Sequence, residues 1–460
     1  MLGKQQKGSS TSDLNEAIAA EEAVFLERQP LSRQLYRRAI GSLAGGVTSS
    51  WQITTPQPVF IEEGRGSHIV DVDGQEYVDL HGGYGAGLAG HAHPAIVAAV
   101  ADRVARGTHF AQPNEDAIVV AENLASRFGL PLWRFTNSGT EATMDAVHLM
   151  RAVTGRDLIV KMEGCYHGHH DSVQVSVAPA ADEVGSLLVP NRVPATLGVP
   201  RAITDLTLIA TFNSVASVKS LLDQHPGKIA GVIVEPVMMN AGIIEPIGGY
   251  LAELKSLLHE HGALLAFDEV KSGLTAGYGG ATAAYGVEPD LICLAKAIGG
   301  GLVVGAVGGT EATMGKVVDG TYEMVGTFNG NALSMAAARA MLERVATYEA
   351  YEKLFALQRL AAEKIAMSIE KSLIKARVVT VGAKGCVTFS PEPVINYRDF
   401  LAIDDRFNHL HWLYQHNRGV FLPPWGKIEQ WTISFQHSDA DMERFTTNFA
   451  EFAELVASLQ

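Results

Sequence analysis

The segment GALLAFDEV, residues 262–270, contains a short apolar run, residues 263–267, that ends at the carboxylate of Asp268. Comparable runs occur on both sides of it, and segments with helical periodicity separate them. The predicted strands are residues 158–162, 206–210, 229–234, 263–267 and 291–294. This alternation, from about residue 94 to residue 314, predicts an α/β fold with a mostly parallel central sheet. Ligands bind at the carboxyl ends of strands in such sheets, so the residues that follow these runs are candidates for a site.

The chain on either side of this region has a different pattern. Residues 14–28 and 31–39 are predicted helices, and residues 59–62, 69–72 and 77–80 are predicted to form a small antiparallel meander. Beyond a predicted helix at 332–345, short strands, helices and a capping box at 438–441 indicate a small α+β domain. We therefore expect a disordered tail at 1–12, an N-terminal segment at 13–93 that packs with the small domain, a large domain at 94–332 and the small domain at 333–460.

The composition limits the classes of function. The chain has 460 residues, 47% of them hydrophobic, and a formal net charge of −14. We expect no nucleic-acid partner, because no block of Lys and Arg accompanies the acidic excess, and no membrane partner, because no apolar run approaches the roughly 20 residues of a spanning helix. Cys165, Cys293 and Cys386 are odd in number and far apart, which together with the polar N-terminus favours the reducing cytoplasm over a disulfide framework.

Ser138, Gly139 and Thr140 directly precede a helical pattern. The glycine lets the backbone approach a ligand, the hydroxyls can donate hydrogen bonds, and the start of a helix offers free N–H groups to an anion. These residues therefore predict an anion-binding turn. An ordinary helix cap would have the same residue types, so that alternative stays open.

Asp268 and Lys296 each follow an apolar run. A carboxylate at the end of a buried strand needs a cation or a hydrogen-bond donor beside it, unless Asp268 simply caps a following helix. Lys296 lies among apolar neighbours, which remove water from its amine, lower its pKa and make it a nucleophile; the alternative is a surface lysine.

Residues 163–171, EGCYHGHHD, also follow a predicted strand. Tyr166 offers a ring that can stack on a planar ligand. The histidines could bind zinc, but no second ligand cluster with familiar spacing occurs, so we expect no metal. Cys165 could act as a nucleophile, although a buried thiol is the simpler interpretation.

An anion-binding turn, a carboxylate, a desolvated lysine and a stacking ring together suit pyridoxal 5′-phosphate. The turn would bind the phosphate, Tyr166 would stack on the ring, Asp268 would keep the pyridine nitrogen protonated and Lys296 would form the Schiff base. Each motif alone is weak evidence, whereas their order along one alternating region is a strong joint signal.

At these residues the sequence resembles the class-III aminotransferases of fold type I, and within them the glutamate-1-semialdehyde aminomutases and β-amino-acid aminotransferases. The similarity runs from about Gly45 to the C-terminus. The matching segments are NSGTEA at 137–142, TGRD at 154–157, EGCYHGH at 163–169, EPV at 235–237, GALLAFDEV at 262–270, PDL at 289–291, the residues around Lys296, and GT and GN at 326–327 and 330–331.

The resemblance implies an enzyme with pyridoxal phosphate as cofactor. It implies that Ser138, Gly139 and Thr140 bind the phosphate, Tyr166 stacks on the ring, Asp268 pairs with the ring nitrogen, Val270 packs behind the ring, Asn240 bonds the phenolic oxygen and Lys296 is the reactive lysine; His167 and Glu235 belong to the same cofactor site. It also implies that Thr327 reaches the phosphate of a neighbouring subunit, which makes the enzyme a homodimer with shared active sites.

The substrate loop departs from the family pattern. The aminomutase arginine that holds the substrate carboxylate is replaced, because residues 45–52 read GGVTSSWQ. We therefore place Ser50, Trp51, Gln52 and Tyr84 in the substrate pocket and expect an aminotransferase that takes an amine or β/ω-amino donor and a keto acceptor. The alternatives are a glutamate-1-semialdehyde 2,1-aminomutase, a racemase of the same fold, or a catalytically silent relative.

Overall fold

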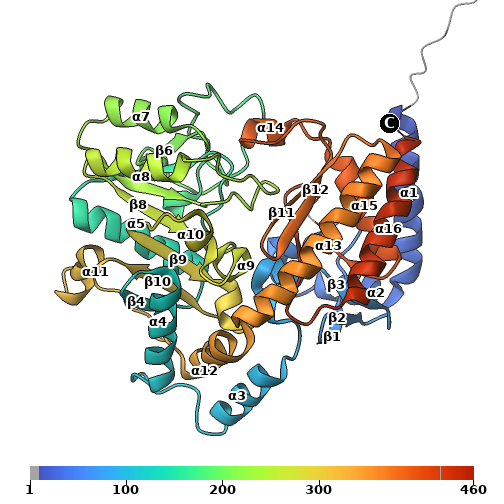
Figure 1. Ribbon diagram of the computed structural model, residues 1–460, viewed down its shortest axis with the longest axis horizontal. Helices are drawn as coiled ribbons and strands as arrows, with labels where there is room; N and C mark the ends of the chain where they lie inside the picture. Colours follow the sequence, from blue (N-terminus) through green and yellow to red (C-terminus); the bar gives the residue numbers. More distant parts are fainter. Residues whose placement is uncertain (1–9, 425, 460) are drawn as a thin grey trace, which may run out of the picture.

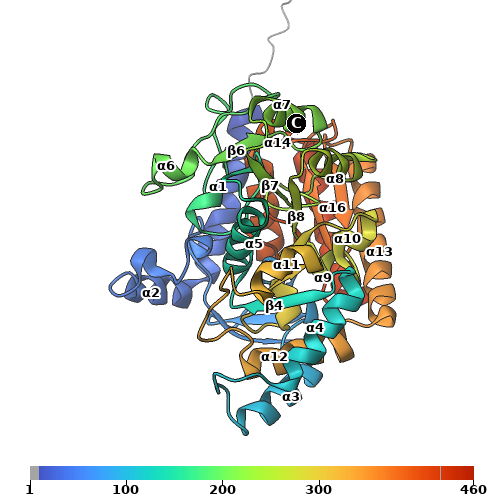
Figure 2. The ribbon, with the colours of Figure 1, turned by 90° about the vertical axis from the view of Figure 1, so that its left-hand side faces the viewer.

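A seven-stranded sheet forms the centre of the large domain in this computed structural model, which describes residues 10–424 and 426–459 (Figures 1 and 2). The strand order is β4-β10-β9-β8-β7-β5-β6. The strands are β4 Leu132–Thr136, β5 Leu158–Met162, β6 Thr207–Ala210, β7 Ile229–Val234, β8 Leu264–Asp268, β9 Leu291–Ala295 and β10 Gly305–Gly309. Five neighbours, β6, β5, β7, β8 and β9, pair in parallel, which confirms the mostly parallel sheet.

Strands β4 and β10 were not among the predicted strands. β10 is antiparallel to both β4 and β9. Its sequence, GAVGG, has few large side chains because side chains of the neighbouring strands occupy the space beside its backbone. A Cβ at Gly308, for example, would lie 2.5 Å from the Trp133 ring. The strand is thus built of glycine to admit a large side chain from β4.

The sheet is buried on both faces, because alternate side chains of its strands belong to two different cores. Ile233, Ala266 and Cys293 pack with helix α5, Gly139–Thr154, and with Met314 of α11, Glu311–Val318. The alternate residues, such as Phe267, pack with the other helices of the large domain. These helices are α3 Pro94–Val104, α4 Glu115–Phe128, α6 Arg201–Thr204, α7 Val215–Gln224, α8 Tyr250–Glu260, α9 Gly273–Ala276, α10 Gly280–Tyr285 and α12 Ala332–Ala340.

The smaller domain combines helices with a three-stranded antiparallel sheet (Figure 1). Its elements are α13 Tyr348–Ser372, β11 Arg377–Val381, β12 Lys384–Thr388, α14 Tyr397–Leu401, α15 Asp405–Asn417, β13 Val420–Phe421, β14 Trp431–Thr432 and α16 Asp439–Ala457. The predicted helix at 332–345 is α12 followed by a π-helical turn, Met341–Val345. The predicted capping box is confirmed, since the Ser438 and Asp441 side chains each accept a hydrogen bond from the other residue's backbone N–H.

The N-terminal segment packs against this smaller domain. Helix α1, Ser10–Arg28, lies along α15, and α2 spans Pro30–Ala39. The predicted meander forms as β1 Ile61–Arg65, β2 His68–Asp71 and β3 Glu76–Asp79, and β13 joins it in parallel with β3. Because α1 begins at Ser10, residues 10–12 of the expected tail are helical, which corrects that part of the prediction; residues 1–9 lie outside the described residues.

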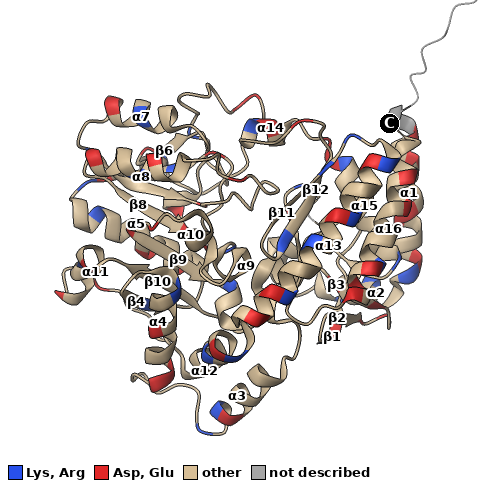
Figure 3. Cartoon of the chain, in the orientation of Figure 1, with Lys and Arg blue, Asp and Glu red and all other residues tan. Residues whose placement is uncertain are grey.

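Acidic and basic residues alternate along the outer helices rather than forming a basic face in this view (Figure 3). Lys364 with Glu443 and Lys371 with Glu454, for example, are ion pairs that join α13 to α16. Within the described residues, none of the helices has the length and apolar character needed to cross a membrane.

Candidate active site

Three neighbouring strands of the central sheet end at a cavity of about 400 Å³. Glu235 follows β7, Asp268 ends β8 and Lys296 follows β9. The cavity brings together most of the residues predicted from the sequence: Trp51, Tyr84, Ser138, Gly139, Thr140, Tyr166, His167, Glu235, Asn240, Asp268, Val270 and Lys296.

Three predicted site residues lie elsewhere. Ser50 is exposed and does not line the cavity. Gln52 lines a neighbouring cavity of about 520 Å³, and its Oε1 accepts hydrogen bonds from the N–H and hydroxyl of Thr48 at 3.0 and 2.7 Å. Thr327 lies in a third cavity beside Asn329, away from Lys296 of its own chain.

Lys296 occupies an unusual backbone conformation directly after β9. Its φ of +52° lies in the left-handed region that favours glycine, and such strain is typical of functional residues. Burial, and then the charge of Lys271, lower the pKa of Lys296 to about 8, against the opposing effect of Asp268. The predicted desolvation of this amine is therefore found in the structure.

The partner expected for Asp268 is a histidine. His167 Nδ1 lies 2.8 Å from Asp268 Oδ2, and the Val270 N–H donates to the other carboxylate oxygen at 3.0 Å. Both side chains are buried. His167 Nε2 is also buried and has no hydrogen-bond partner among the described residues.

Glu235 is hydrogen-bonded to the loop that carries Tyr166. Its Oε1 accepts the Tyr166 N–H at 3.0 Å, and its Oε2 accepts the Met239 N–H at 2.8 Å. Trp51 packs edge-on against Tyr166, with ring centroids 5.7 Å apart, and its carbonyl accepts the Tyr84 hydroxyl at 2.7 Å. Three aromatic rings thus form one wall of the cavity.

The predicted anion-binding turn is the start of α5. Ser138 caps this helix, because its hydroxyl accepts the Glu141 N–H at 3.2 Å, so the ordinary cap also exists. A Cβ at Gly139 would lie 2.8 Å from Val270 Cγ1, which shows that only glycine fits between the helix start and Val270. The N–H groups of Gly139 and Thr140 belong to the first turn, where no carbonyl of the helix can accept them.

The residues present fit pyridoxal phosphate. The first turn of α5 offers N–H groups and hydroxyls to a phosphate, the space kept by Gly139 would be filled by any side chain, and the carboxylate of Asp268 faces the same cavity. The histidines do not form a metal centre: the described residues contain no group of three or more His, Cys, Asp or Glu suited to a metal ion. Cys165 is buried, and burial raises its pKa well above the usual value, so its thiol stays protonated.

Lys271 and Glu429 also line the cavity, although neither is among the residues predicted from the sequence. Lys271 comes three residues after Asp268, so its place at the end of β8 was a usable signal. Glu429 comes from the smaller domain, just before β14, and nothing in its local sequence marks it.

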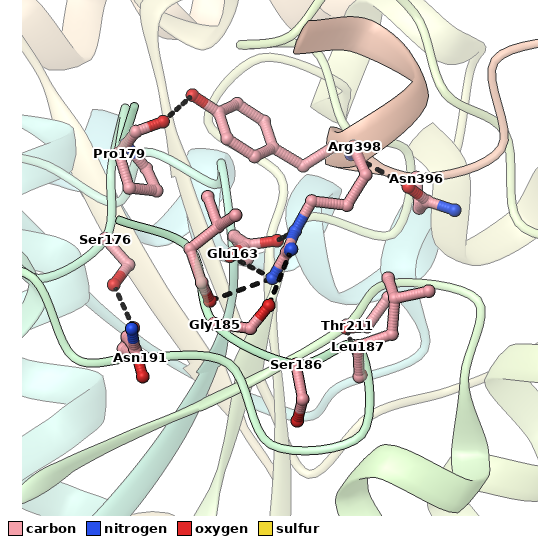
Figure 4. A network of polar contacts seen from close by, with 12 residues as sticks. Glu163, Ser176, Pro179, Gly185, Ser186, Leu187, Asn191, Thr211, Asn396 and Arg398 are labelled. Carbon is pink, nitrogen blue, oxygen red and sulfur yellow. Dashed lines mark hydrogen bonds and ion pairs between the residues drawn. The ribbon is translucent and has the colours of Figure 1, made fainter. Parts of the chain in front are cut away.

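A second network ties the smaller domain to the Tyr166 loop (Figure 4). Arg398, from α14, donates to Glu163 Oε1 at 3.0 Å and to the carbonyls of Val184 and Gly185 at 2.9 and 3.0 Å. Glu163 is 1% exposed and is three residues from Tyr166. The network therefore holds two loops of the large domain against the smaller one.

Comparisons with known proteins agree with this geometry. The model of the family described as aminotransferase class-III matches residues 50–449. A curated relative, glutamate-1-semialdehyde 2,1-aminomutase 2 of Brevibacillus brevis, is 38% identical over 419 residues, which cover 90% of this chain and 96% of the relative.

Solved structures of transaminases are also similar to this chain. An omega-transaminase from Sphaerobacter thermophilus has a TM-score of 0.89 at 33% identity and covers 94% of this chain and 99% of its own. A transaminase solved with pyridoxal phosphate bound has a TM-score of 0.84 at 29% identity and covers 94% of this chain and 98% of its own.

Proposed function

Because this chain belongs to the class-III aminotransferase family, we propose that it transfers an amino group from an amine or β/ω-amino compound to a keto acceptor at the cavity around Lys296. The family is pyridoxal-phosphate dependent, and the chain has its fold type I architecture. The cofactor supplies an electron-withdrawing ring that stabilises negative charge on the substrate carbon.

The residues of the chain would bind this cofactor and move the proton. Ser138, Gly139 and Thr140 would hold the phosphate, Tyr166 and Val270 would pack on the two faces of the ring, Asp268 would keep the ring nitrogen protonated and Asn240 would bond the phenolic oxygen. Lys296 accepts and returns a proton at Nζ, a role that its pKa of about 8 suits near neutral pH. Glu235 and His167 fix the orientation of the Tyr166 loop and of Asp268.

The observation that supports the donor class is the cavity lining. None of the described residues that line the cavity is an arginine, and of the four residues predicted for the substrate pocket only Trp51 and Tyr84 line it. A donor with a carboxylate next to the amine would find no guanidinium there. A panel of amines, β-amino acids and α-amino acids with pyruvate and 2-oxoglutarate tests this proposal; exclusive use of α-amino acids would refute it.

The 38% identity to the Brevibacillus brevis relative supports a second candidate, the aminomutase reaction, which needs no separate acceptor. Turnover of glutamate-1-semialdehyde without any keto acid would establish it in place of our proposal. The position of Thr327 away from its own Lys296 supports a homodimer in which it serves the other subunit, and sedimentation measurements test this state. We also propose a cytoplasmic location, because all three cysteines are free and buried; cell fractionation tests it.

A further inference from the structure

Two charged side chains that line the reaction cavity, Lys271 and Glu429, are not among the residues to which we assign the cofactor. Lys271 Nζ donates to both carboxylate oxygens of Glu429, at 2.7 and 2.8 Å, and to the Met239 carbonyl at 2.8 Å. Lys271 is 7% and Glu429 6% exposed, and both line the cavity. The pair is therefore a buried charged surface that a substrate meets.

A second lysine lies directly behind the cavity wall. Lys384, the first residue of β12, is fully buried, and its Nζ donates to the Thr432 hydroxyl at 3.0 Å. Among the described residues, no carboxylate forms an ion pair with it. A Cβ at Gly85 would lie 3.0 Å from Lys384 Cε and 3.3 Å from Nζ, and the neighbours of Gly85, Tyr84 and Ala86, line the cavity.

Among the charged groups around Lys384, lysines outnumber carboxylates. Besides Lys271, the charged groups that act on Lys384 are Glu429 and Lys296, and only Glu429 raises its pKa. Burial, and then Lys271, lower the pKa of Lys384 to about 7. His81 also lies near Lys384, but burial lowers its pKa, so it adds no charge near neutral pH.

Glu429 cannot balance both cations. Burial alone would raise its pKa, but Lys271, Lys384 and Lys296 together hold it below the usual value, so Glu429 is already ionised. Lys271 and Lys384 therefore share one carboxylate in a space that excludes water. A buried cation without a counter-ion is costly, and an incoming anion would remove that cost.

We propose that the carboxylate of the keto acceptor supplies this missing anion by binding at Lys271, with Lys384 stabilising it from behind the Gly85 wall. The inference rests on the proposed aminotransferase function. Lys271 Nζ exchanges one of its two bonds to Glu429 for a bond to the acceptor. The two lysines thereby bind a carboxylate, as an arginine does in other sites. Lys384 acts as a positioning residue because it does not touch the acceptor.

Acceptors with and without a carboxylate test the role of Lys271. In Lys271→Met we expect the KM for pyruvate to rise about 10- to 100-fold more than the KM for propanal, as for a lost charged hydrogen bond. The two acceptors are compared because the charge of Lys271 also lowers the pKa of Lys296, so the variant changes turnover with both. Lys271→Arg should retain pyruvate binding. Lys353→Met, which removes an exposed lysine from α13, is the matched control.

Lys271→Met leaves Glu429 buried without its partner, so the variant can lose stability. The double variant Lys271→Met with Glu429→Gln removes both charges of the pair and permits the same measurement if the single variant does not fold. An unchanged KM for pyruvate in a variant that still transfers amino groups would overturn the proposal.

The binding of propionate, an unreactive carboxylate, tests Lys384 without turnover. Anion binding favours protonated Lys384, so affinity should fall as the pH rises through about 7. We expect propionate to bind the holoenzyme several-fold more weakly one pH unit above this value than one unit below it, and this dependence to flatten in Lys384→Met. The same pH dependence in Lys384→Met as in the native chain would refute the role of Lys384.

These results are distinguishable from a failure of the proposed function. If the native protein binds pyridoxal phosphate but transfers no amino group to any acceptor, the proposed function fails. If it transfers amino groups to pyruvate and to propanal with no loss specific to pyruvate in the Lys271 variants, only the carboxylate site fails.

Discussion

His167 Nδ1 lies 2.8 Å from Asp268 Oδ2, and this contact fixes the carboxylate that faces the reaction cavity. The other oxygen of Asp268 accepts the Val270 N–H, so neither the histidine nor the carboxylate can rotate without losing a hydrogen bond. The site therefore presents Asp268 in one orientation before any cofactor binds.

Asp268→Asn should lower kcat by roughly 10²-fold, because a neutral amide no longer stabilises a proton on the ring nitrogen of the cofactor. Turnover and the visible absorbance of the bound cofactor provide the measurement. Asp223→Asn, on the exposed face of α7, should behave as the native protein. Full activity of Asp268→Asn would contradict the role assigned to this carboxylate.

Arg398→Met should destabilise the protein by about 3–5 kcal/mol, because it leaves the carboxylate of Glu163 buried without its cation. Chemical unfolding gives this value. Adding Glu163→Gln should recover most of the loss, since the buried charge is then gone. If the double variant is no more stable than Arg398→Met, the ion pair does not account for the stability.

Gly139→Ala should weaken cofactor binding by at least tenfold, because its Cβ would lie 2.8 Å from Val270 Cγ1 and displace either the helix start or Val270. Gly315→Ala is the matched control: nothing lies within 4 Å of its Cβ, and in helix α11 the change should stabilise by about 0.4–1 kcal/mol. Titration of the apoprotein with pyridoxal phosphate compares the two. Equal affinities would show that the space at Gly139 is not part of the cofactor site.

Lys384→Met should stabilise the protein by about 1–4 kcal/mol below pH 7, because it removes a buried charge that lacks a counter-ion. The folded-state pKa of Lys384 is about 7, whereas the ordinary value is 10.5. Between these values the unfolded chain binds more protons than the folded one, so the contribution of Lys384 to stability rises with pH in this window. Unfolding at several pH values should show this slope in the native chain and its loss in Lys384→Met; no difference between the two slopes would contradict the shifted pKa.

The edge of the sheet could be predicted from sequence, because its signal is local. The apolar runs of β5, β7, β8 and β9 each end in a polar residue, and parallel strands bring those ends together. Asp268 and Lys296 were found in this way. The helix start at Ser138 was found from its capping and glycine chemistry.

The rest of the site depends on tertiary packing. Glu429 and Lys384 come from the smaller domain, and neither has a local pattern that distinguishes it from other polar residues. β10 was missed because glycine carries no apolar period, although Trp133 of β4 explains why glycine is there. The orientation of Gln52 toward Thr48 likewise depends on the folded loop rather than on its position in the sequence.

The left-handed backbone of Lys296 places two demands on one position. The fold alone would favour glycine there, because glycine adopts a φ of +52° without steric strain. Reaction chemistry instead requires a primary amine, which lysine alone among the side chains supplies. Replacing Lys296 by glycine would therefore relieve the backbone strain but remove the reactive amine, so the lysine at this position is explained by the reaction and not by the fold.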